Sequence, residues 1–283
     1  MKAAEKGSFT GAAGELFLSQ PAVSRTIKTL EDELHIKLFF RDKRNGLILT
    51  DAGRRILLLA RQMEGMENRI YQTAFRENNF LGGRVRVASL PVLTSVILAR
   101  VLRSFRDKYP FVEVEISEGS SREIRNAVEE HGADFGFAFS PFGDLDCEIL
   151  MTDRMVAVSR MPLEHGSPFA PDGKSRCILC RAGYETVLES WKSGKSRLEC
   201  SLVVQQAESV ISLAREGNGI GILSELVLDS IPNDLCRNEL EPPVETRVGL
   251  IAQDMRDVTP AASALMAMIR EECGNYLRRK PAR

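Results

Sequence analysis

A polar helix face between residues 19 and 28 carries side chains that suit contacts with a polyanion. Its members include hydrogen-bonding and cationic groups and no acid: Ser19, Gln20, Pro21, Ser24, Arg25 and Lys28. Arginine and glutamine can read base edges in the major groove of DNA, while serine, lysine and a helix N-terminus hold phosphates. A solvated helix face usually mixes both signs of charge. From this segment alone, base recognition and simple solvation both remain open.

Two short, closely joined helices position this face. The sequence predicts a first helix over residues 9–17 with Ser8 as its N-cap, and a turn at Leu18. Ser19 then caps a second helix, with Pro21 in its first turn, where a missing N–H costs nothing. Apolar residues recur along the second helix at steps of four, three and four, which predicts a buried stripe. The stripe consists of Val23, Ile27, Leu30 and Leu34.

A basic hairpin is expected directly after these helices. Two short apolar runs flank an Asn45-Gly46 turn within residues 38–50, and this pattern predicts two strands. Arg41 and Arg44 lie near the tip of the hairpin. A cationic hairpin beside a helix-turn-helix suits the neighbouring minor groove or the phosphate backbone.

A long helix is predicted over residues 52–77, where only two glycines interrupt the helical pattern. Apolar residues spaced three and four apart form a seam along it: Ile56, Leu59, Met63, Met66, Ile70 and Ala74. Such a seam favours pairing with a second copy of the helix. Packing against its own domain is the alternative. The composition of residues 78–83 then predicts a hinge.

Beyond this hinge the sequence alternates between strand-like and helical segments. The expected strands cover residues 84–89, 112–117, 134–139, 155–159, 177–180, 219–223 and 248–252. The expected helices cover residues 94–109, 121–131, 185–192, 208–216 and 260–276. Alternation of this kind predicts parallel sheets covered by helices, here in two α/β lobes with a cleft between them. The final helix is expected to return to the first lobe.

The charge distribution sets the first segment apart from the rest. Residues 1–55 hold ten Lys or Arg against seven Asp or Glu, a net charge of +3, and the remaining 28 bases and 32 acids give −4. A basic head on an acidic body permits contact between the head and phosphate. No apolar run reaches the roughly 18 residues that span a bilayer, so we expect a cytoplasmic protein without membrane contact.

The sequence gives no indication of a catalytic, metal or cofactor site. Cys177 and Cys180 match a CxxC pattern, but no second pair accompanies them, and we interpret both as core thiols of a strand. The glycines of GNGIGI at residues 217–222 follow a helix and enter a strand, so they suit a helix C-cap better than a phosphate loop. The three histidines lie far apart in the sequence.

Five segments carry a family resemblance. They are GSFTGAAGEL at 7–16, SQPAVSR at 19–25, LEDEL at 30–34, LFFR at 38–41 and LTDAG at 49–53. Together they closely resemble the N-terminal signature of LysR-type transcriptional regulators, and similarity continues more loosely over the rest. The resemblance implies a winged helix-turn-helix, a dimerising linker helix, and two lobes like those of periplasmic binding proteins. It also implies a small coinducer between the lobes and, usually, a tetramer built as a dimer of dimers.

Some site residues follow from the resemblance alone. Gln20, Pro21, Ser24 and Arg25 match positions that meet double-stranded promoter DNA in the major groove, and Arg44 matches a wing cation that enters the minor groove. The implied coinducer contacts are Ser89, Pro91, Thr94, Ser95, Gln205 and Gln206. Hydroxyls, amides and N–H groups at a helix N-terminus suit an anionic coinducer. Ordinary helix capping is the alternative role for Thr94 and Ser95.

The implied organisation has three parts. The DNA-binding domain covers residues 1–51, the linker helix and hinge cover 52–81, and the effector-binding domain covers 82–283. Its first lobe takes in about 82–150 and 255–283, and its second lobe about 151–254. The resemblance also implies a further half-helix before the position of Met1, so we expect either a start site called too late or a truncated opening helix. A ligand-binding module with impaired DNA binding is therefore the alternative function.

Overall fold

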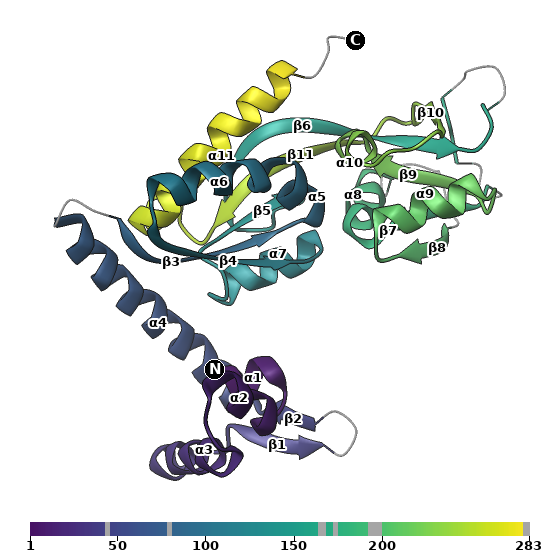
Figure 1. The fold of residues 1–283 in the computed structure, drawn as a ribbon. Coiled ribbons are helices and arrows are strands. Elements are labelled where there is room, and N and C mark those ends of the chain that lie inside the picture. Colours follow the sequence, from purple (N-terminus) through teal and green to yellow (C-terminus); the bar gives the residue numbers. More distant parts are fainter. Residues whose placement is uncertain (43–45, 78–80, 164–167, 172–174, 192–199, 280–283) are drawn as a thin grey trace. The chain divides into compact units, whose positions relative to one another are not determined.

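The computed structural model describes residues 1–42, 46–77, 81–163, 168–171, 175–191 and 200–279. Two compact units make up the chain, Met1–Ile70 and Tyr71–Arg283 (Figure 1). Among the helices described, none combines the length and the apolarity that crossing a bilayer requires.

The first unit contains short helices, a hairpin and most of a long helix. In chain order these are α1 (Lys2–Lys6), α2 (Phe9–Leu16), α3 (Gln20–Leu34), β1 (Phe39–Asp42), β2 (Gly46–Leu49) and α4 (Asp51–Glu77). Both predicted N-caps are confirmed. The Ser8 hydroxyl accepts the N–H of Gly11 at 3.2 Å, and the Ser19 hydroxyl accepts the N–H of Ala22 at 3.3 Å. The turn between α2 and α3 begins at Phe17, one residue earlier than predicted, in the left-handed region.

The core of the first unit is small and lies between α1, α2, the N-terminal half of α3 and the hairpin. Its members are Ala3, Ala12, Ala13 and Val23, with Phe9, Phe39 and Leu47 packed against them. The predicted stripe of α3 is therefore correct only at its N-terminal end. Leu30 and Leu34 are 38% and 42% exposed, because this core does not reach the C-terminal turns of α3.

One buried acid ties α3 to the hairpin. Glu31 accepts the N–H groups of Leu38 at 2.8 Å and Phe39 at 3.2 Å, and it pairs with the Lys37 ammonium at 2.6 Å. Burial acts to raise the pKa of Glu31, but the hydrogen bond from Lys37 and those from the two N–H groups outweigh it and leave the pKa lowered. The sequence pattern placed Glu31 only as an acid on α3, so this role was not predicted.

The hairpin is also held against the start of α4. The Thr50 hydroxyl donates to the carbonyl of Lys37 at 2.6 Å and accepts the N–H of Gly53 at 2.8 Å. A Cβ atom on Gly53 would lie 2.1 Å from the carbonyl oxygen of Leu38. Only glycine fits this approach of backbone to backbone.

The predicted seam of α4 is exposed. This helix has 27 residues, a length of about 40 Å at 1.5 Å per residue. Leu59, Met63, Met66 and Ile70 are 54%, 73%, 57% and 63% exposed. The prediction of a helix over 52–77 is confirmed, and its apolar seam is not covered by the described part of the chain.

The last turns of α4 belong to the second unit. Gln72 is fully buried there. Its amide donates to the carbonyl of Arg84 at 3.0 Å and accepts the N–H of Ala261 at 2.9 Å. One side chain thus satisfies a strand carbonyl and an N–H in the first turn of the last helix.

The second unit is a two-lobed α/β structure. Its strands are β3 (Gly82–Ser89), β4 (Phe111–Glu118), β5 (Phe135–Phe139), β6 (Asp146–Ser159), β7 (Cys177–Cys180), β8 (Cys200–Val204), β9 (Ile220–Ser224), β10 (Cys236–Asn238) and β11 (Glu245–Ala252). Its helices are α5 (Pro91–Leu93), η1 (Thr94–Leu98), α6 (Ala99–Lys108), α7 (Ser121–Glu129), α8 (Arg181–Trp191), α9 (Ala207–Arg215), α10 (Glu225–Ser230) and α11 (Pro260–Arg279).

The sheet is mixed: the expected parallel pairs are present, and antiparallel pairs join them. The strand order is β4-β3-β5-β11-β6-β9-β7-β8, with β10 paired to β6. The outer pairs are parallel, but β11 and β6 run antiparallel to each other and to their neighbours. Figure 1 shows the 14-residue β6 passing from one lobe into the other. The helical crossovers predicted the parallel pairs, whereas β6 and β11 are returning strands.

Other local differences follow from short or uneven patterns. The sequence missed β8, β10 and α10, which are three to six residues long. Gly82 and Gly83 begin β3 and are not part of a hinge, while residues 78–80 lie outside the described residues. The last helix packs against α6 and β3, which confirms its predicted return to the first lobe (Figure 1).

Several sequence interpretations of the second unit are confirmed. Cys177 and Cys180 are buried free thiols on β7. Gly217 follows the end of α9 with φ of 77°. Gly219 enters β9 with φ of 153°, and a Cβ atom there would lie 2.6 Å from the carbonyl oxygen of Arg176. These glycines end a helix and allow a close strand approach.

Candidate nucleic-acid interface and ligand pocket

The N-terminal half of α3 presents the predicted polar face to solvent. Pro21, Arg25 and Lys28 are exposed, and Gln20 and Ser24 are half-buried. Among the described residues, Arg25 and Lys28 make no hydrogen bond or ion pair. Two cations one turn apart on an exposed helix face, with no close ion pair among the described residues, form a surface that can attract phosphate.

The structure describes the position of one of the two predicted hairpin cations, Arg41. The Arg41 guanidinium carbon lies 5.9 Å from the centre of the Phe9 ring, a cation–π contact. This contact orients Arg41 beside the start of α2. The other predicted cation, Arg44, lies outside the described residues.

A cavity of about 870 Å³ lies between the two lobes of the second unit. Helix α5 with the π-helical turn η1, the end of β4 and the start of α7 line it from the first lobe. The starts of α8 and α9, and α10, line it from the second lobe. Its volume falls within the range of small-molecule binding pockets.

Four of the six predicted coinducer contacts line this cavity: Pro91, Ser95, Gln205 and Gln206. Ser89 does not, because it is fully buried and donates its hydroxyl to the carbonyl of Leu90 at 3.2 Å. Thr94 does not line the cavity either. Its hydroxyl and that of Ser95 each donate to the carbonyl four residues earlier, so neither acts as a helix cap.

A π-helical turn forms part of the cavity wall. Ser95 and Val96 belong to this turn, Thr94–Leu98, within the continuous helical segment 91–108. Single π-turns inside α-helices occur frequently at functional sites. The sequence predicted the helix but not the change in its winding.

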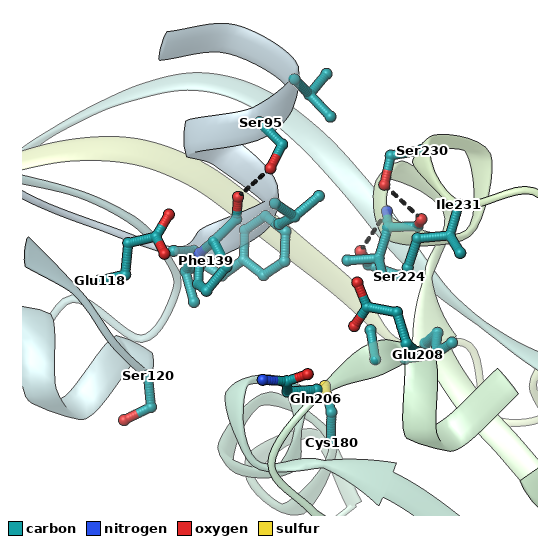
Figure 2. Close-up of a pocket in the computed structure, with 18 of the residues that line it drawn as sticks. Ser95, Glu118, Ser120, Phe139, Cys180, Gln206, Glu208, Ser224, Ser230 and Ile231 are labelled. Atoms are coloured by element: carbon teal, nitrogen blue, oxygen red, sulfur yellow. Dashed lines mark hydrogen bonds between the residues drawn. The ribbon is translucent and has the colours of Figure 1, made fainter. Parts of the chain in front are cut away.

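The cavity also holds charged residues that the sequence analysis missed. The acids are Glu118, Glu123, Glu208 and Asp229, and the cations are Arg100 and Arg181. They come from segments up to 129 residues apart (100 to 229), so no local pattern marks them as a group. Figure 2 shows Glu118 and Glu208 with their carboxylates directed into the pocket from opposite sides.

Two of these acids have structural partners. Glu123 accepts the N–H of Ser120 at 2.7 Å and its hydroxyl at 2.8 Å in a capping box, and these bonds hold the pKa of Glu123 below its ordinary value. Asp229 pairs with the Arg237 guanidinium at 2.6 Å. Among the described residues, the side chains of Glu118 and Glu208 make no hydrogen bond or ion pair.

Neither cation of the cavity has an acid at short ion-pair distance among the described residues, although the charge of Arg181 helps to lower the pKa of Glu123. The Arg181 Nε–H donates to the side-chain oxygen of Gln205 at 2.8 Å, so its nearest hydrogen-bonding partner is a neutral amide. Arg100 lies 3.9 Å from a carboxylate oxygen of Glu272, at the outer limit of an ion pair. Within the described parts of the chain, no three His, Cys, Asp or Glu side chains come together as a metal site.

Family models cover nearly all of the chain. The model described as "LysR substrate binding domain" matches residues 78–274. The model described as "Bacterial regulatory helix-turn-helix protein, lysR family" matches residues 1–54. The chain belongs to the LysR family of DNA-binding transcriptional regulators with an effector-binding domain, as the resemblance predicted.

Two curated relatives match this chain over nearly its full length. The chain is 39% identical over 276 residues to the uncharacterized HTH-type transcriptional regulator YoaU of Bacillus subtilis, covering 95% of each sequence. It is 31% identical over 282 residues to YvbU of the same organism, covering 97% of this chain and 96% of the relative. Both relatives are described as transcriptional regulators.

Solved structures show the same fold at low identity. A full-length OxyR variant from Pseudomonas aeruginosa has a TM-score of 0.68 at 18% identity, covering 96% of this chain and 94% of that protein. CbnR, a LysR family regulator, has a TM-score of 0.62 at 18% identity and 96% coverage of both chains. The order of helix-turn-helix, long helix and α/β domain is thus common to these proteins.

Proposed function

We propose that this regulator reads promoter DNA with the exposed face of α3 and the β1–β2 hairpin. The observation that carries the proposal is that Arg25 and Lys28 are exposed on α3 without a partner among the described residues. Gln20, Pro21 and Ser24 occupy the same face, and Ser19 leads into it as the N-cap. We assign base contacts to Gln20 and Arg25 and phosphate contacts to Lys28, with Arg41 and Arg44 contributing from the hairpin.

The proposal predicts different effects for two cations of α3. Arg25→Ala should weaken binding to the promoter region next to this gene by about 1–3 kcal/mol and relax sequence preference. Lys28→Ala should weaken binding to all sequences about equally, because a phosphate contact carries no sequence information. Gel-shift titrations at one salt concentration measure both effects.

Arg103→Ala is the matched control, since Arg103 is an exposed arginine of the second unit. It should leave promoter affinity unchanged. Equal affinities for the wild-type protein and Arg25→Ala would show that this face of α3 does not contact bases.

We further propose that α4 pairs with α4 of a second copy through its exposed seam, and that two such dimers form a tetramer. The double variant Leu59→Glu, Met63→Glu should lose the α4 pairing and give a smaller oligomer, because both introduced charges would be desolvated in the interface. Asn68→Glu, on the face of α4 opposite the seam, should leave the oligomer intact. Sedimentation equilibrium distinguishes these outcomes, and unchanged oligomers of the double variant would exclude the seam.

The cavity of the second unit is, in this proposal, the coinducer site of a cytoplasmic regulator that performs no catalysis. We propose that the coinducer is a small organic molecule with an anionic group near the start of α9. The N-cap of α9, Gln206, makes no side-chain capping bond, and the Arg181 guanidinium is bonded to the adjacent Gln205. A helix N-terminus beside a guanidinium favours a carboxylate.

A further inference from the structure

The cavity contains more acid than its proposed anionic ligand would explain. Four carboxylates and two guanidinium groups line it. Glu123 and Asp229 are held by Ser120 and by Arg237, so both serve the structure of the cavity wall. Glu118 and Glu208 remain, and neither has a partner among the described residues.

These two carboxylates face the cavity from different lobes. Glu118 is the last residue of β4 in the first lobe, and Glu208 lies in the first turn of α9 in the second lobe. In Figure 2 their side chains point into the pocket from opposite sides, with Ser95 and Gln206 between them in the view. A ligand that fills the cavity would remove water from both carboxylates.

This desolvation decides which ligands bind well. Binding is strongly disfavoured when a carboxylate loses its water without gaining a partner. A ligand with an ammonium group would instead give charge-assisted hydrogen bonds to the same oxygens. A divalent cation is a poorer occupant, because it needs six or more ligand oxygens, and the described residues offer no cluster of three metal-binding side chains.

We propose that the coinducer is a zwitterion, with an ammonium group held by Glu118 and Glu208 and a carboxylate held by Arg181 and the start of α9. The inference rests on the proposed function, since it names the ligand class of the proposed coinducer site. Amino acids and small amino carboxylates have this chemistry. Both charged groups of the ligand contribute to specificity. A ligand with only a carboxylate leaves Glu118 and Glu208 without an ammonium partner, and a ligand with only an amine leaves Arg181 without a carboxylate partner.

Matched sets of small molecules test the proposal on the full-length protein. One set has adjacent charges: L-leucine, its desamino analogue 4-methylpentanoate, and its decarboxylated analogue 3-methylbutylamine. A second set has separated charges: 6-aminohexanoate, hexanoate and hexylamine. Thermal shift followed by calorimetric titration should show that the zwitterion of at least one set binds about tenfold or more tightly than its acid and its amine.

Variants then locate the ammonium group. Glu118→Gln and Glu208→Gln should each reduce affinity for that zwitterion by about tenfold and leave affinity for the matched acid unchanged. Glu113→Gln is the control, because Glu113 is exposed on the same strand but does not line the cavity. Arg181→Ala should weaken binding of the zwitterion and the acid alike.

Three results would overturn the proposal. They are equal binding of the zwitterion and its acid, unchanged zwitterion affinity in both glutamine variants, and binding of no member of either set. Gel-shift assays with the same protein preparations distinguish failure of this ligand proposal from failure of the proposed DNA-binding function. Promoter binding with no zwitterion preference rejects only the ligand class, whereas wild-type protein that binds no promoter rejects the proposed function itself.

Discussion

The polar face of α3 and the wall of the interlobe cavity both contain charged side chains without a partner among the described residues, but the sign of the charge differs. On the N-terminal half of α3 the unpaired side chains among the described residues are the cations Arg25 and Lys28, while the acid Glu31, further along the same helix, is tied to the start of the hairpin. In the cavity the unpaired groups include the acids Glu118 and Glu208, while other acids are tied to the wall.

This comparison separates two uses of charge within one chain. A charge with several internal partners stabilises the fold, and its removal should lower the free energy of unfolding. A charge without partners contributes little to the fold and remains available to a ligand. The sign of the charge on the unpaired side chains then indicates the ligand. It is a polyanion for the polar face of α3 and an ammonium group for the cavity.

The largest effect on folding should come from an ion pair in which both side chains are mostly buried. Arg86 and Asp134 are 13% and 11% exposed, their charged groups lie 3.0 Å apart, and Asp134 also accepts the N–H of Arg86 at 2.8 Å. Asp134→Ala leaves a buried guanidinium without this partner, so we expect a loss of about 3–5 kcal/mol in the free energy of unfolding. Fluorescence of Trp191, the only tryptophan, reports urea unfolding of the second unit.

Asp234→Ala is the matched control for this change. Asp234 pairs with Arg215 at 2.9 Å, but its side chain is 77% exposed, and such pairs add little stability. The urea midpoint should stay at the wild-type value. Equal shifts of the urea midpoint in both aspartate variants would contradict the comparison. They would show that burial and pairing do not separate charges that stabilise the fold from charges that can bind a ligand.

A smaller effect is expected at Glu31. Glu31→Gln retains one acceptor oxygen but loses the charge that Lys37 and the N–H groups of Leu38 and Phe39 bind, so we expect a loss of about 1–3 kcal/mol. Hydrogen exchange at those two amides measures it directly. Glu33→Gln, at an exposed position of the same helix, is the control.

The pH dependence of the Glu31 effect has a defined sign. The pKa of Glu31 is lowered in the folded protein, so its contribution is fully present above the ordinary value of 4.5. The contribution is lost as the pH falls from there through the lowered pKa. The difference between wild type and Glu31→Gln should therefore shrink on acidification below about pH 4.5, and a constant difference would contradict the charged role of Glu31.

The two sites differed in how far the sequence could predict them. The face of α3 is contiguous, so helical spacing alone grouped Gln20, Ser24 and Arg25. The charges of the cavity come from β4, α6, α7, α8, α9 and α10, and only the fold brings them together. Glu31 was missed for a related reason, because the pattern of α3 does not show that the chain after it returns its N–H groups to that side chain.

The same limit applies to the fold: local patterns predicted individual elements, but not the pairing of strands far apart in the sequence. Long periodic helices such as α4 and α11, and the strands with helical crossovers, follow from local patterns. The antiparallel pairing of β6 with β11 joins segments about 100 residues apart, and no local pattern specifies it.

The burial of Gln72 has a consequence for exchanging domains between members of this family. Gln72 lies within α4, yet its hydrogen bonds end on Arg84 and Ala261. A chimera joined at the glycines after α4 would bring a foreign side chain to this position and orphan two backbone groups, at a cost of about 1–3 kcal/mol each. A junction before Tyr71 keeps the donor's own glutamine with its strand and its last helix. The exchangeable module therefore starts inside the long helix.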